Sequence, residues 1–126
     1  MGKVPLFWKL AAGWALLIFV LSSIPGRSIP APPFAVSDKL LHAGVYSVLG
    51  FFCFFALPRP PSRRAAVHVA LTVLAVTLYG CTDEFHQLFV PGRSPDPLDV
   101  MADCVGGAMG AIVGSLLPFA KSRAAS

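Results

Sequence analysis

Charge is scarce in this chain. Only 13% of its 126 residues are charged, whereas 56% are apolar and the mean hydropathy is +0.72. An ordinary soluble domain carries about 25% charged residues and alternates apolar with polar positions at helix or strand periods. The composition therefore excludes an ordinary soluble protein and is typical of a membrane protein, and the length fits a single domain over residues 1–126.

Cysteines and recognisable catalytic motifs are also few. The three cysteines, Cys53, Cys81 and Cys104, lie in apolar segments, and their spacing matches neither a disulfide framework nor a zinc site. We interpret them as small core residues. No nucleophile motif surrounds Ser94, and the sequence predicts no organic cofactor.

Apolar sequence is abundant, in four segments that are each long enough to cross a bilayer, which takes roughly 20 apolar residues in a helix. The predicted spans are residues 6–24, 40–57, 66–90 and 98–117. Every proline except Pro5 lies in a loop or next to a predicted helix end. We therefore predict an all-α integral membrane four-helix bundle with short loops. Its first segment is too long for the apolar core of a signal peptide, so we expect it to be a retained anchor.

Basic residues are unevenly divided between the two sides of this predicted bundle. The side that carries both termini and the second loop holds seven of them: Lys3, Lys9, Arg59, Arg63, Arg64, Lys121 and Arg123. The other side holds three: Arg27, Lys39 and Arg93. Because Lys and Arg in short loops are retained in the cytoplasm, we predict a multi-pass plasma-membrane protein with cytoplasmic N- and C-termini. The net charge of +4 is then a topology signal, and we predict no nucleic-acid partner.

All the acidic residues fall at or near the predicted outer face, although they were not used to derive the orientation. They are Asp38, Asp83, Glu84, Asp96, Asp99 and Asp103. Residues three or four apart share a helix face, so Asp38, His42 and Tyr46 form one stripe of the second span. The ends of three helices thus pool their polar side chains in one cluster.

The fourth span carries a stripe of small residues. Asp99 and Asp103 share it with Gly106, Gly110 and Gly114, a doubled G-x-x-x-G pattern that lets membrane helices approach closely. The two carboxylates are therefore predicted to point into the bundle. We favour packing within the bundle for this stripe, with a homo-oligomer through the same three glycines as the alternative.

Three stretches, "SSIPG", "SDKLLHAGVY" and "DEFHQLFVPGRSPDPLDVMADCVGGAMG", resemble the VanZ-like family of small membrane proteins. The family pattern has Asp-Lys followed three residues later by His, then Glu-x-x-Q, an Arg after a Pro-Gly turn, and an Asp followed four residues on by Asn. The matching residues are Asp38, Lys39, His42, Glu84, Gln87, Arg93 and Asp99. The expected Asn is Asp103, which brings a carboxyl group to the most buried part of the cluster. The resemblance implies an association with low-level resistance to the glycopeptide antibiotic teicoplanin.

The favoured function is binding of a membrane lipid or lipid-linked cell-wall precursor through its headgroup, in a polar pocket of the outer leaflet. Lys39 and Arg93 are predicted to hold a phosphate or carboxylate, since Arg suits bidentate phosphate recognition. Carboxylate and amide oxygens are predicted to accept hydrogen bonds from headgroup hydroxyls or amides. The predicted binding residues are Asp38, Lys39, His42, Tyr46, Glu84, Gln87, Arg93, Asp99 and Asp103.

The alternative function is a membrane-embedded hydrolase or transferase acting on a lipid-linked substrate. The catalytic candidates are His42, Glu84, Asp99 and Asp103, with His42 or His86 as general base and Arg93 stabilising developing charge. A divalent cation held by Glu84, Asp99 and Asp103 is a further alternative, because oxygen ligands suit magnesium, calcium or manganese.

A purely structural role is an alternative for some of these residues. Asp38 would cap the second helix, Asp99 would lie in the first turn of the fourth, and both would form ion pairs with Arg93. This interpretation leaves Glu84 and Asp103 unexplained, because one lies late in its helix and the other a full turn inside the next. Transport is disfavoured, since the inner halves of the spans are apolar with no polar trail, and His68 near the cytoplasmic end is expected at the interface.

Overall fold

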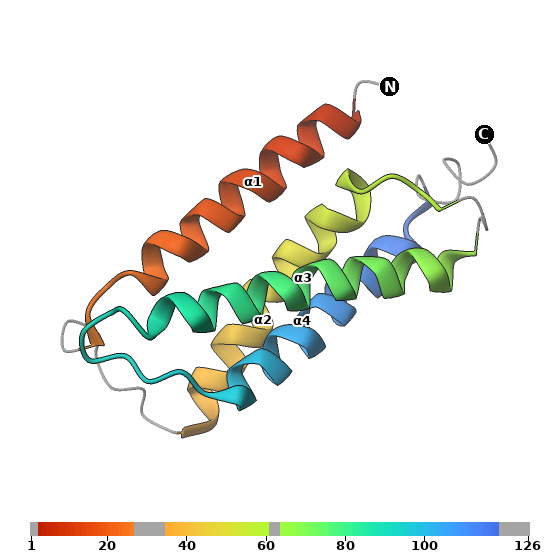
Figure 1. The fold of residues 1–126 in the computed structure, drawn as a ribbon. Helices are drawn as coiled ribbons and strands as arrows, with labels where there is room; N and C mark the ends of the chain where they lie inside the picture. The colour runs from red at the N-terminus through yellow and green to blue at the C-terminus, as the bar shows by residue number, and fades with distance from the viewer. Residues whose placement is uncertain (1–2, 27–34, 61–63, 119–126) are drawn as a thin grey trace.

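Four helices make up the part of the protein that the structure describes. The computed structural model describes residues 3–26, 35–60 and 64–118. Its elements are α1 (Lys3–Ser22), α2 (Ala35–Ala56), α3 (Ala65–Gln87) and α4 (Pro97–Leu116), and these ranges contain no strand (Figure 1). All four are long and apolar enough to cross a membrane. The predicted all-α four-helix membrane bundle is therefore confirmed.

The helix boundaries differ from the predicted spans where a helix extends past its apolar run. Helix α2 begins at Ala35 rather than near residue 40, so Asp38 lies inside the first turn. The expectation that Asp38 caps this helix is therefore wrong. Helix α3 ends at Gln87 instead of residue 90. The cap residue of α4 is Asp96, whose carboxylate accepts from the Leu98 N–H at 2.9 Å.

The glycine stripe of α4 lies against α2, and these two helices share the most extensive interface of the bundle. A Cβ atom at Gly106 or Gly110 would overlap the backbone carbonyls of Ala43 or Ser47 on α2. The absence of side chains there lets the two backbones meet. Helix α2 thus covers the glycine stripe. An oligomer through the same glycines would require α2 to move away from α4.

Helix α1 lies at one edge of the bundle and packs mainly on α2, with little contact to α3 (Figure 1). Two side-chain hydrogen bonds hold the middle of α1 against its neighbours. The Trp14 indole N–H donates to the Val45 carbonyl at 2.9 Å, and the Tyr79 hydroxyl donates to the Ala15 carbonyl. The outer surfaces of the helices expose large apolar side chains, for example Leu16 at 62% and Met101 at 62%, as expected where lipid surrounds a protein.

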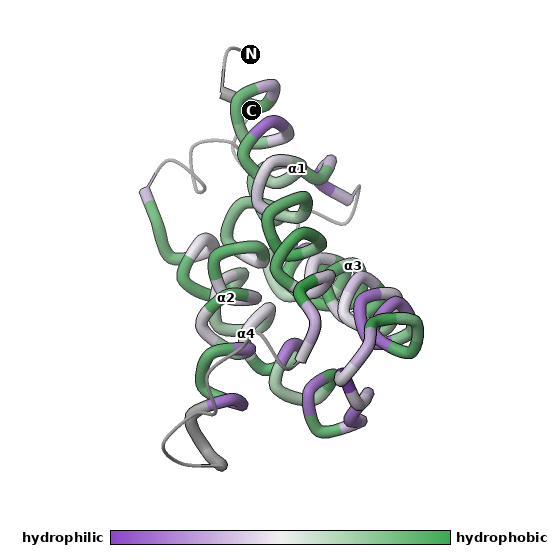
Figure 2. The backbone as a smooth tube through the Cα atoms, turned by 90° about the vertical axis from the view of Figure 1, so that its left-hand side faces the viewer, coloured by the Kyte–Doolittle hydropathy of each residue, from purple (hydrophilic) through white to green (hydrophobic). Residues whose placement is uncertain are grey.

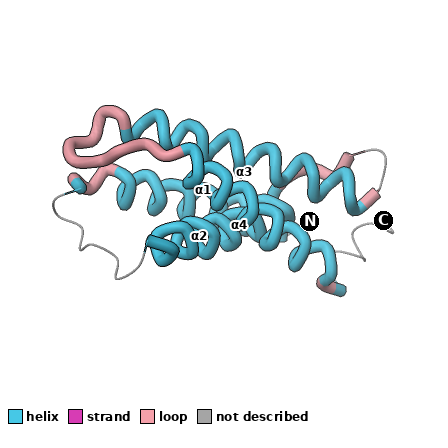
Figure 3. The backbone as a smooth tube through the Cα atoms, turned by 90° about the horizontal axis from the view of Figure 1, so that it is seen from below, coloured by secondary structure: helices cyan, strands magenta, loops and turns pink. Residues whose placement is uncertain are grey.

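One end of the bundle is polar. Helices α1 and α3 end there and α2 and α4 begin there, and we call this the polar end; the opposite end is the apolar end. Figure 2 looks onto the polar end and shows hydrophilic segments among helices that are otherwise mostly hydrophobic. Figure 3 shows the segment after α1 and the loop between α3 and α4 together at this end. Of the basic residues that set the predicted orientation, Arg27, Arg63, Lys121 and Arg123 lie outside the described residues.

Candidate functional site

Lys39 is the centre of an ion-pair network at the polar end. It lies in the first half of α2, and its ammonium donates to Asp99 Oδ1 and, at 2.9 Å, to Asp96 Oδ2. Asp38 Oδ2 is 3.5 Å away. The Lys39 ammonium, together with the Leu98 N–H, holds the pKa of the exposed Asp96 carboxyl below its ordinary value. The predicted phosphate-binding lysine is therefore already surrounded by three carboxylates.

His42 and Asp103 form a second pair, one turn deeper in the bundle. His42 Nδ1 is 2.9 Å from Asp103 Oδ1, and the Asp103 side chain is 0% exposed. Gly80 on α3 leaves room for this carboxylate, since a Cβ there would lie 2.8 Å from Asp103 Oδ2. Asp103 on α4 thus contacts His42 of α2 and lies against Gly80 of α3.

Glu84, which the structural alternative left unexplained, reaches from the last turn of α3 toward the start of α4. Its Oε2 accepts the backbone N–H of Asp96 at 3.0 Å, and its side chain is buried with 7% exposure. The carboxylate satisfies a backbone donor at the beginning of another helix, where the helix dipole favours negative charge. The Asp96 N–H at the start of α4 therefore offsets the unfavourable dipole that a carboxylate meets late in α3.

Arg93 binds backbone carbonyls at the end of α1. Its Nε donates to the Ile24 carbonyl and its Nη2 to the Leu21 carbonyl, both at 3.0 Å. Arginine here satisfies carbonyls that the end of a helix leaves without partners. Among the described residues Arg93 forms no ion pair with a carboxylate. Lys39 instead makes the ion pairs with Asp38 and Asp99 that were expected for Arg93.

The loop that carries Arg93 is a tight turn that also contacts the segment after α1. Gly92 has φ 76° after Pro91, and the Arg93 N–H donates to the Val90 carbonyl at 3.2 Å, as in a type II turn. The Gly26 N–H donates to the Pro91 carbonyl at 2.9 Å. The "SSIPG" and "PGR" stretches therefore form one clamp between α1 and α3.

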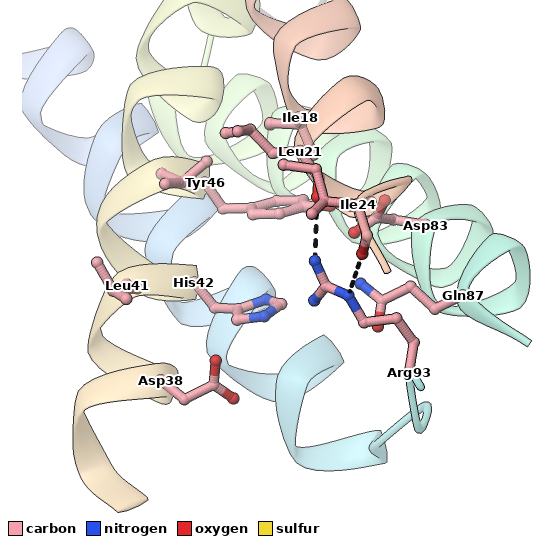
Figure 4. Close-up of a pocket in the computed structure, with 12 residues that line it drawn as sticks. Ile18, Leu21, Ile24, Asp38, Leu41, His42, Tyr46, Asp83, Gln87 and Arg93 are labelled. Atoms are coloured by element: carbon pink, nitrogen blue, oxygen red, sulfur yellow. Dashed lines mark hydrogen bonds between the residues drawn. The ribbon is translucent and has the colours of Figure 1, made fainter. Parts of the chain in front are cut away.

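A cleft of about 460 Å³ lies between α1, α2, α3 and Arg93 (Figure 4). Ile18, Leu21 and Leu41 line it with apolar side chains, while Asp83 and His42 contribute polar ones. The full lining is Ile18, Leu21, Ser22, Ile24, Asp38, Leu41, His42, Val45, Tyr46, Asp83, Gln87 and Arg93. The cleft is thus amphipathic, with an apolar wall from α1 and α2 and polar groups at the ends of three helices.

The predicted site residues divide into two adjoining groups. Asp38, His42, Tyr46, Gln87 and Arg93 line the cleft. The other four, Lys39, Glu84, Asp99 and Asp103, form the network behind it, and His42 joins the two groups through Asp103.

Two residues outside the predicted set belong to this site. Asp96 binds Lys39 and caps α4, and its position just before Pro97 is the usual sequence signal of a helix cap. Asp83 lines the cleft and is 5% exposed. Its spacing from Gln87 places it on the same face of α3, although the family pattern does not include it.

Oxygen and nitrogen ligands come together in two groups that are able to hold a metal ion. They are Asp38 with His42 and Asp99, and His42 with Glu84 and Asp103, with ligand atoms within 4.8 Å of one another in each. The set expected from sequence, Glu84 with Asp99 and Asp103, is not among the groups found in the described ranges. His42 replaces one carboxylate because it projects from α2 between Asp99 and Asp103.

The comparisons with known proteins agree with this architecture. The VanZ/LLP1 family model matches residues 7–118. The chain belongs to the VanZ/LLP1 family. The match runs from the first turns of α1 past the end of α4, so family membership covers the clamp, the cleft and the ion-pair network together. No curated protein and no solved structure matches the chain.

Proposed function

We propose that this protein binds, in the cleft between α1, α2 and α3, a membrane lipid whose headgroup carries hydrogen-bond donors, such as a lipid-linked cell-envelope precursor. The supporting observation is the two-sided cleft. Its volume of about 460 Å³ falls within the roughly 300–1,000 Å³ of ordinary ligand pockets. An acyl or polyprenyl chain suits the wall that Ile18, Leu21 and Leu41 form, and the headgroup suits the polar end.

The charges around the cleft favour a lipid headgroup that carries hydrogen-bond donors over a headgroup that carries an anion. Lys39 is bound to carboxylates, and Arg93, which lines the cleft, donates through Nε and Nη2 to carbonyls, so the lining carboxylates Asp38 and Asp83 outnumber its one positive charge. The cleft lining instead offers Asp83 and Gln87, both buried. Hydroxyl, amide and ammonium groups of a sugar or peptide headgroup match these acceptors.

The orientation belongs to the same proposal. The excess of basic residues on the side of both termini supports an orientation in a plasma membrane with that side in the cytoplasm and the polar end in the outer leaflet. Sequestering a cell-wall precursor there would connect the cleft with the teicoplanin resistance associated with the family. Cysteine labelling from outside intact cells tests this orientation, with Ser94→Cys expected to react and Arg64→Cys, just before α3, to stay protected.

The binding experiment uses purified protein in lipid nanodiscs and native mass spectrometry. A lipid-linked precursor with sugar and peptide groups is compared with phosphatidylethanolamine, whose headgroup carries an ammonium, and with a polyprenyl phosphate, which has no such donors. We expect the precursor to bind at least about tenfold more tightly than the polyprenyl phosphate. Tighter binding of phosphatidylethanolamine than of the precursor would identify an ordinary phospholipid as the ligand instead.

Two isosteric variants separate the cleft from the network behind it. Asp83→Asn changes a buried carboxylate of the lining, whereas Asp96→Asn changes an exposed one outside it. We expect about tenfold weaker binding for the first and a change within about twofold for the second. Equal binding by Asp83→Asn, or a polyprenyl phosphate that binds as tightly as the precursor, would exclude the proposed recognition.

One observation favours catalysis as a second candidate function. His42 lines the cleft while the buried Asp103 holds its Nδ1, which is the arrangement of a histidine general base oriented by a carboxylate. Such a base would activate water or a substrate hydroxyl for hydrolysis or transfer. Incubation of the purified protein with labelled lipid precursors, with and without EDTA, tests this, and an absence of turnover under both conditions ends the enzyme hypothesis.

A further inference from the structure

Four buried oxygen atoms in the wall of the cleft and behind it have no hydrogen-bond partner among the residues that the structure describes. They are Tyr46 Oη, Asp83 Oδ1, Glu84 Oε1 and Asp103 Oδ2. All four side chains are less than one-tenth exposed, and one carboxylate oxygen of Glu84 lies within 4.8 Å of one of Asp103. Buried polar atoms are nearly always paired, so unpartnered carboxylate oxygens this close together indicate a ligand that supplies positive charge or donors.

Two of these carboxylates are held in place through one oxygen and leave the other unpartnered. Glu84 Oε2 accepts the Asp96 N–H at 3.0 Å, while Oε1 has no partner. Asp103 Oδ1 is 2.9 Å from His42 Nδ1, while Oδ2 has no partner. A side chain that is fixed by one contact and leaves its second oxygen without a partner has the form of a supported metal ligand.

His42 completes a set of three ligands with these carboxylates. One imidazole nitrogen and one oxygen from each of Glu84 and Asp103 lie within 4.8 Å of one another. Ligands on one metal ion are separated by about 3 Å when adjacent and about 4–4.5 Å when opposite, for bonds of about 2.1 Å. Small side-chain rotations therefore bring all three onto a single ion.

The second group of ligands, Asp38 with His42 and Asp99, is less suited to a metal. The Lys39 ammonium already bonds to Asp99 Oδ1 and lies 3.5 Å from Asp38 Oδ2. A divalent ion there would face this fixed positive charge. The two groups share His42, so an ion is expected only on the side of Glu84 and Asp103.

We propose that His42, Glu84 and Asp103 bind one divalent metal ion, with Zn²⁺ and Mn²⁺ as the ions that suit the donors. The two carboxylates favour hard cations, and the imidazole favours transition metals over magnesium or calcium. The ion neutralises carboxylates from α3 and α4 at the point where His42 of α2 meets them. Because Glu84 and Asp103 do not line the cleft, metal binding does not require the lipid proposed above.

The test uses purified, EDTA-treated full-length protein in detergent, without added lipid. Zn²⁺ is titrated against a fluorescent chelator, and Mn²⁺ binding is followed by electron paramagnetic resonance. We expect one ion per chain and ¹⁴N coupling from an imidazole in the Mn²⁺ spectrum. Absence of this coupling in the unmodified protein, or Mg²⁺ or Ca²⁺ binding as tightly as Zn²⁺, would overturn the proposed ligand set.

Isosteric variants assign the ligands. Glu84→Gln and Asp103→Asn each weaken Zn²⁺ binding by about tenfold or more, and His42→Gln also removes the ¹⁴N coupling. Asp38→Asn, from the less suited group, is the matched control and changes the affinity by less than about twofold. Circular dichroism and size-exclusion chromatography confirm that each variant is folded. A control that weakens binding as much as Asp103→Asn would place the ion elsewhere and refute the proposal.

Failure of metal binding is distinguishable from failure of lipid binding. Asp83→Asn, which lines the cleft, is expected to weaken lipid binding and to leave the ¹⁴N coupling intact. Asp103→Asn is expected to weaken Zn²⁺ binding by about tenfold or more in the absence of any lipid. The Asp83→Asn variant therefore reports on lipid binding, and the Asp103→Asn variant reports on metal binding.

Discussion

The two ends of the bundle are held together in different ways. At the apolar end, the ring of Phe55 lies 4.8 Å from that of Phe7 and 5.2 Å from that of Phe54, and Phe55 is 0% exposed. At the polar end, buried acidic side chains are joined to Lys39, His42 and backbone N–H groups. In a bilayer, apolar side chains gain little by leaving lipid for the protein interior, so shape complementarity holds the apolar end and charge pairing holds the polar end.

The glycine seam between α2 and α4 links these two ends. Gly106 lies near the polar end against Ala43, and Gly114 lies against Phe54 and Phe55 near the apolar end. The same close approach therefore brings the carboxylates of α4 to α2 and lets the aromatic rings fill the other end. A change in the middle of the seam is expected to disturb both ends, whereas changes at one end leave the other intact.

The largest effect is expected from Gly110→Ala. The added Cβ would overlap the Ser47 carbonyl and approach the Phe51 backbone nitrogen, so α2 and α4 have to separate. We expect the free energy of unfolding in detergent to fall by about 3 kcal/mol or more. The matched control is Gly44→Ala, where no atom lies within 4 Å, and it should be neutral or slightly stabilising. Equal stability of the two variants would show that the seam is not close-packed.

The next effect is confined to the polar end. Lys39→Met leaves the buried Asp99 carboxylate without its cation, and we expect the free energy of unfolding to fall by about 2–3 kcal/mol. The double variant Lys39→Met/Asp99→Asn should recover part of this loss, as measured by a double-mutant cycle. Lys9→Met, at an exposed lysine of α1, is the control. Additive losses in the double variant would contradict the role of this ion pair.

A smaller effect is expected at the apolar end. Phe55→Ala removes roughly 100 Å³ of side chain from a fully buried position, and the cavity costs about 2 kcal/mol of unfolding free energy. Phe85→Ala removes the same ring at a position that is 64% exposed and should leave stability unchanged. Zn²⁺ affinity should be the same in both variants. A loss of metal binding on Phe55→Ala would mean that the two ends are coupled.

The smallest expected effect concerns the exposed Asp96. Its pKa is held below the ordinary 3.8 by Lys39 and the Leu98 N–H, so its ion pair stabilises the fold above that value. This contribution is lost as the pH falls through the lowered pKa. Melting temperatures measured from about pH 6 to about pH 3 should show Asp96→Asn below the unmodified protein at the higher pH, with the difference shrinking in acid. A pH-independent difference would exclude the proposed electrostatic cause.

Much of the fold followed from the sequence because each spanning helix must satisfy its own backbone hydrogen bonds within an apolar run. The apolar end was less well predicted. His68 was expected at the interface, yet it is 1% exposed and donates through Nε2 to the Phe54 carbonyl at 2.7 Å. Hydropathy measures how apolar a segment is. It does not show which carbonyl accepts a hydrogen bond from a buried polar side chain.

The partners at the polar end were also predicted incompletely. The sequence identified Lys39 and Arg93 as cations near carboxylates, and both were expected to hold an anion. In the folded chain Lys39 binds Asp96 and Asp99, while Arg93 binds the carbonyls that end α1. Residues that are 57 to 72 positions apart make these contacts, and helix periodicity describes only neighbours within a few turns.

Hydropathy, charge and spacing along one helix are local properties, and they were enough to predict the four apolar helices, the acidic end and the glycine stripe. The contacts between helices could be seen only in the folded chain: Arg93 joins the end of α1 to the loop after α3, His42 lies between the cleft and Asp103, and Glu84 and Asp103 each keep one oxygen without a partner. These contacts depend on how far α2, α3 and α4 approach and rotate against one another. That geometry is set by packing between helices, where glycine removes the side chains that would otherwise hold them apart.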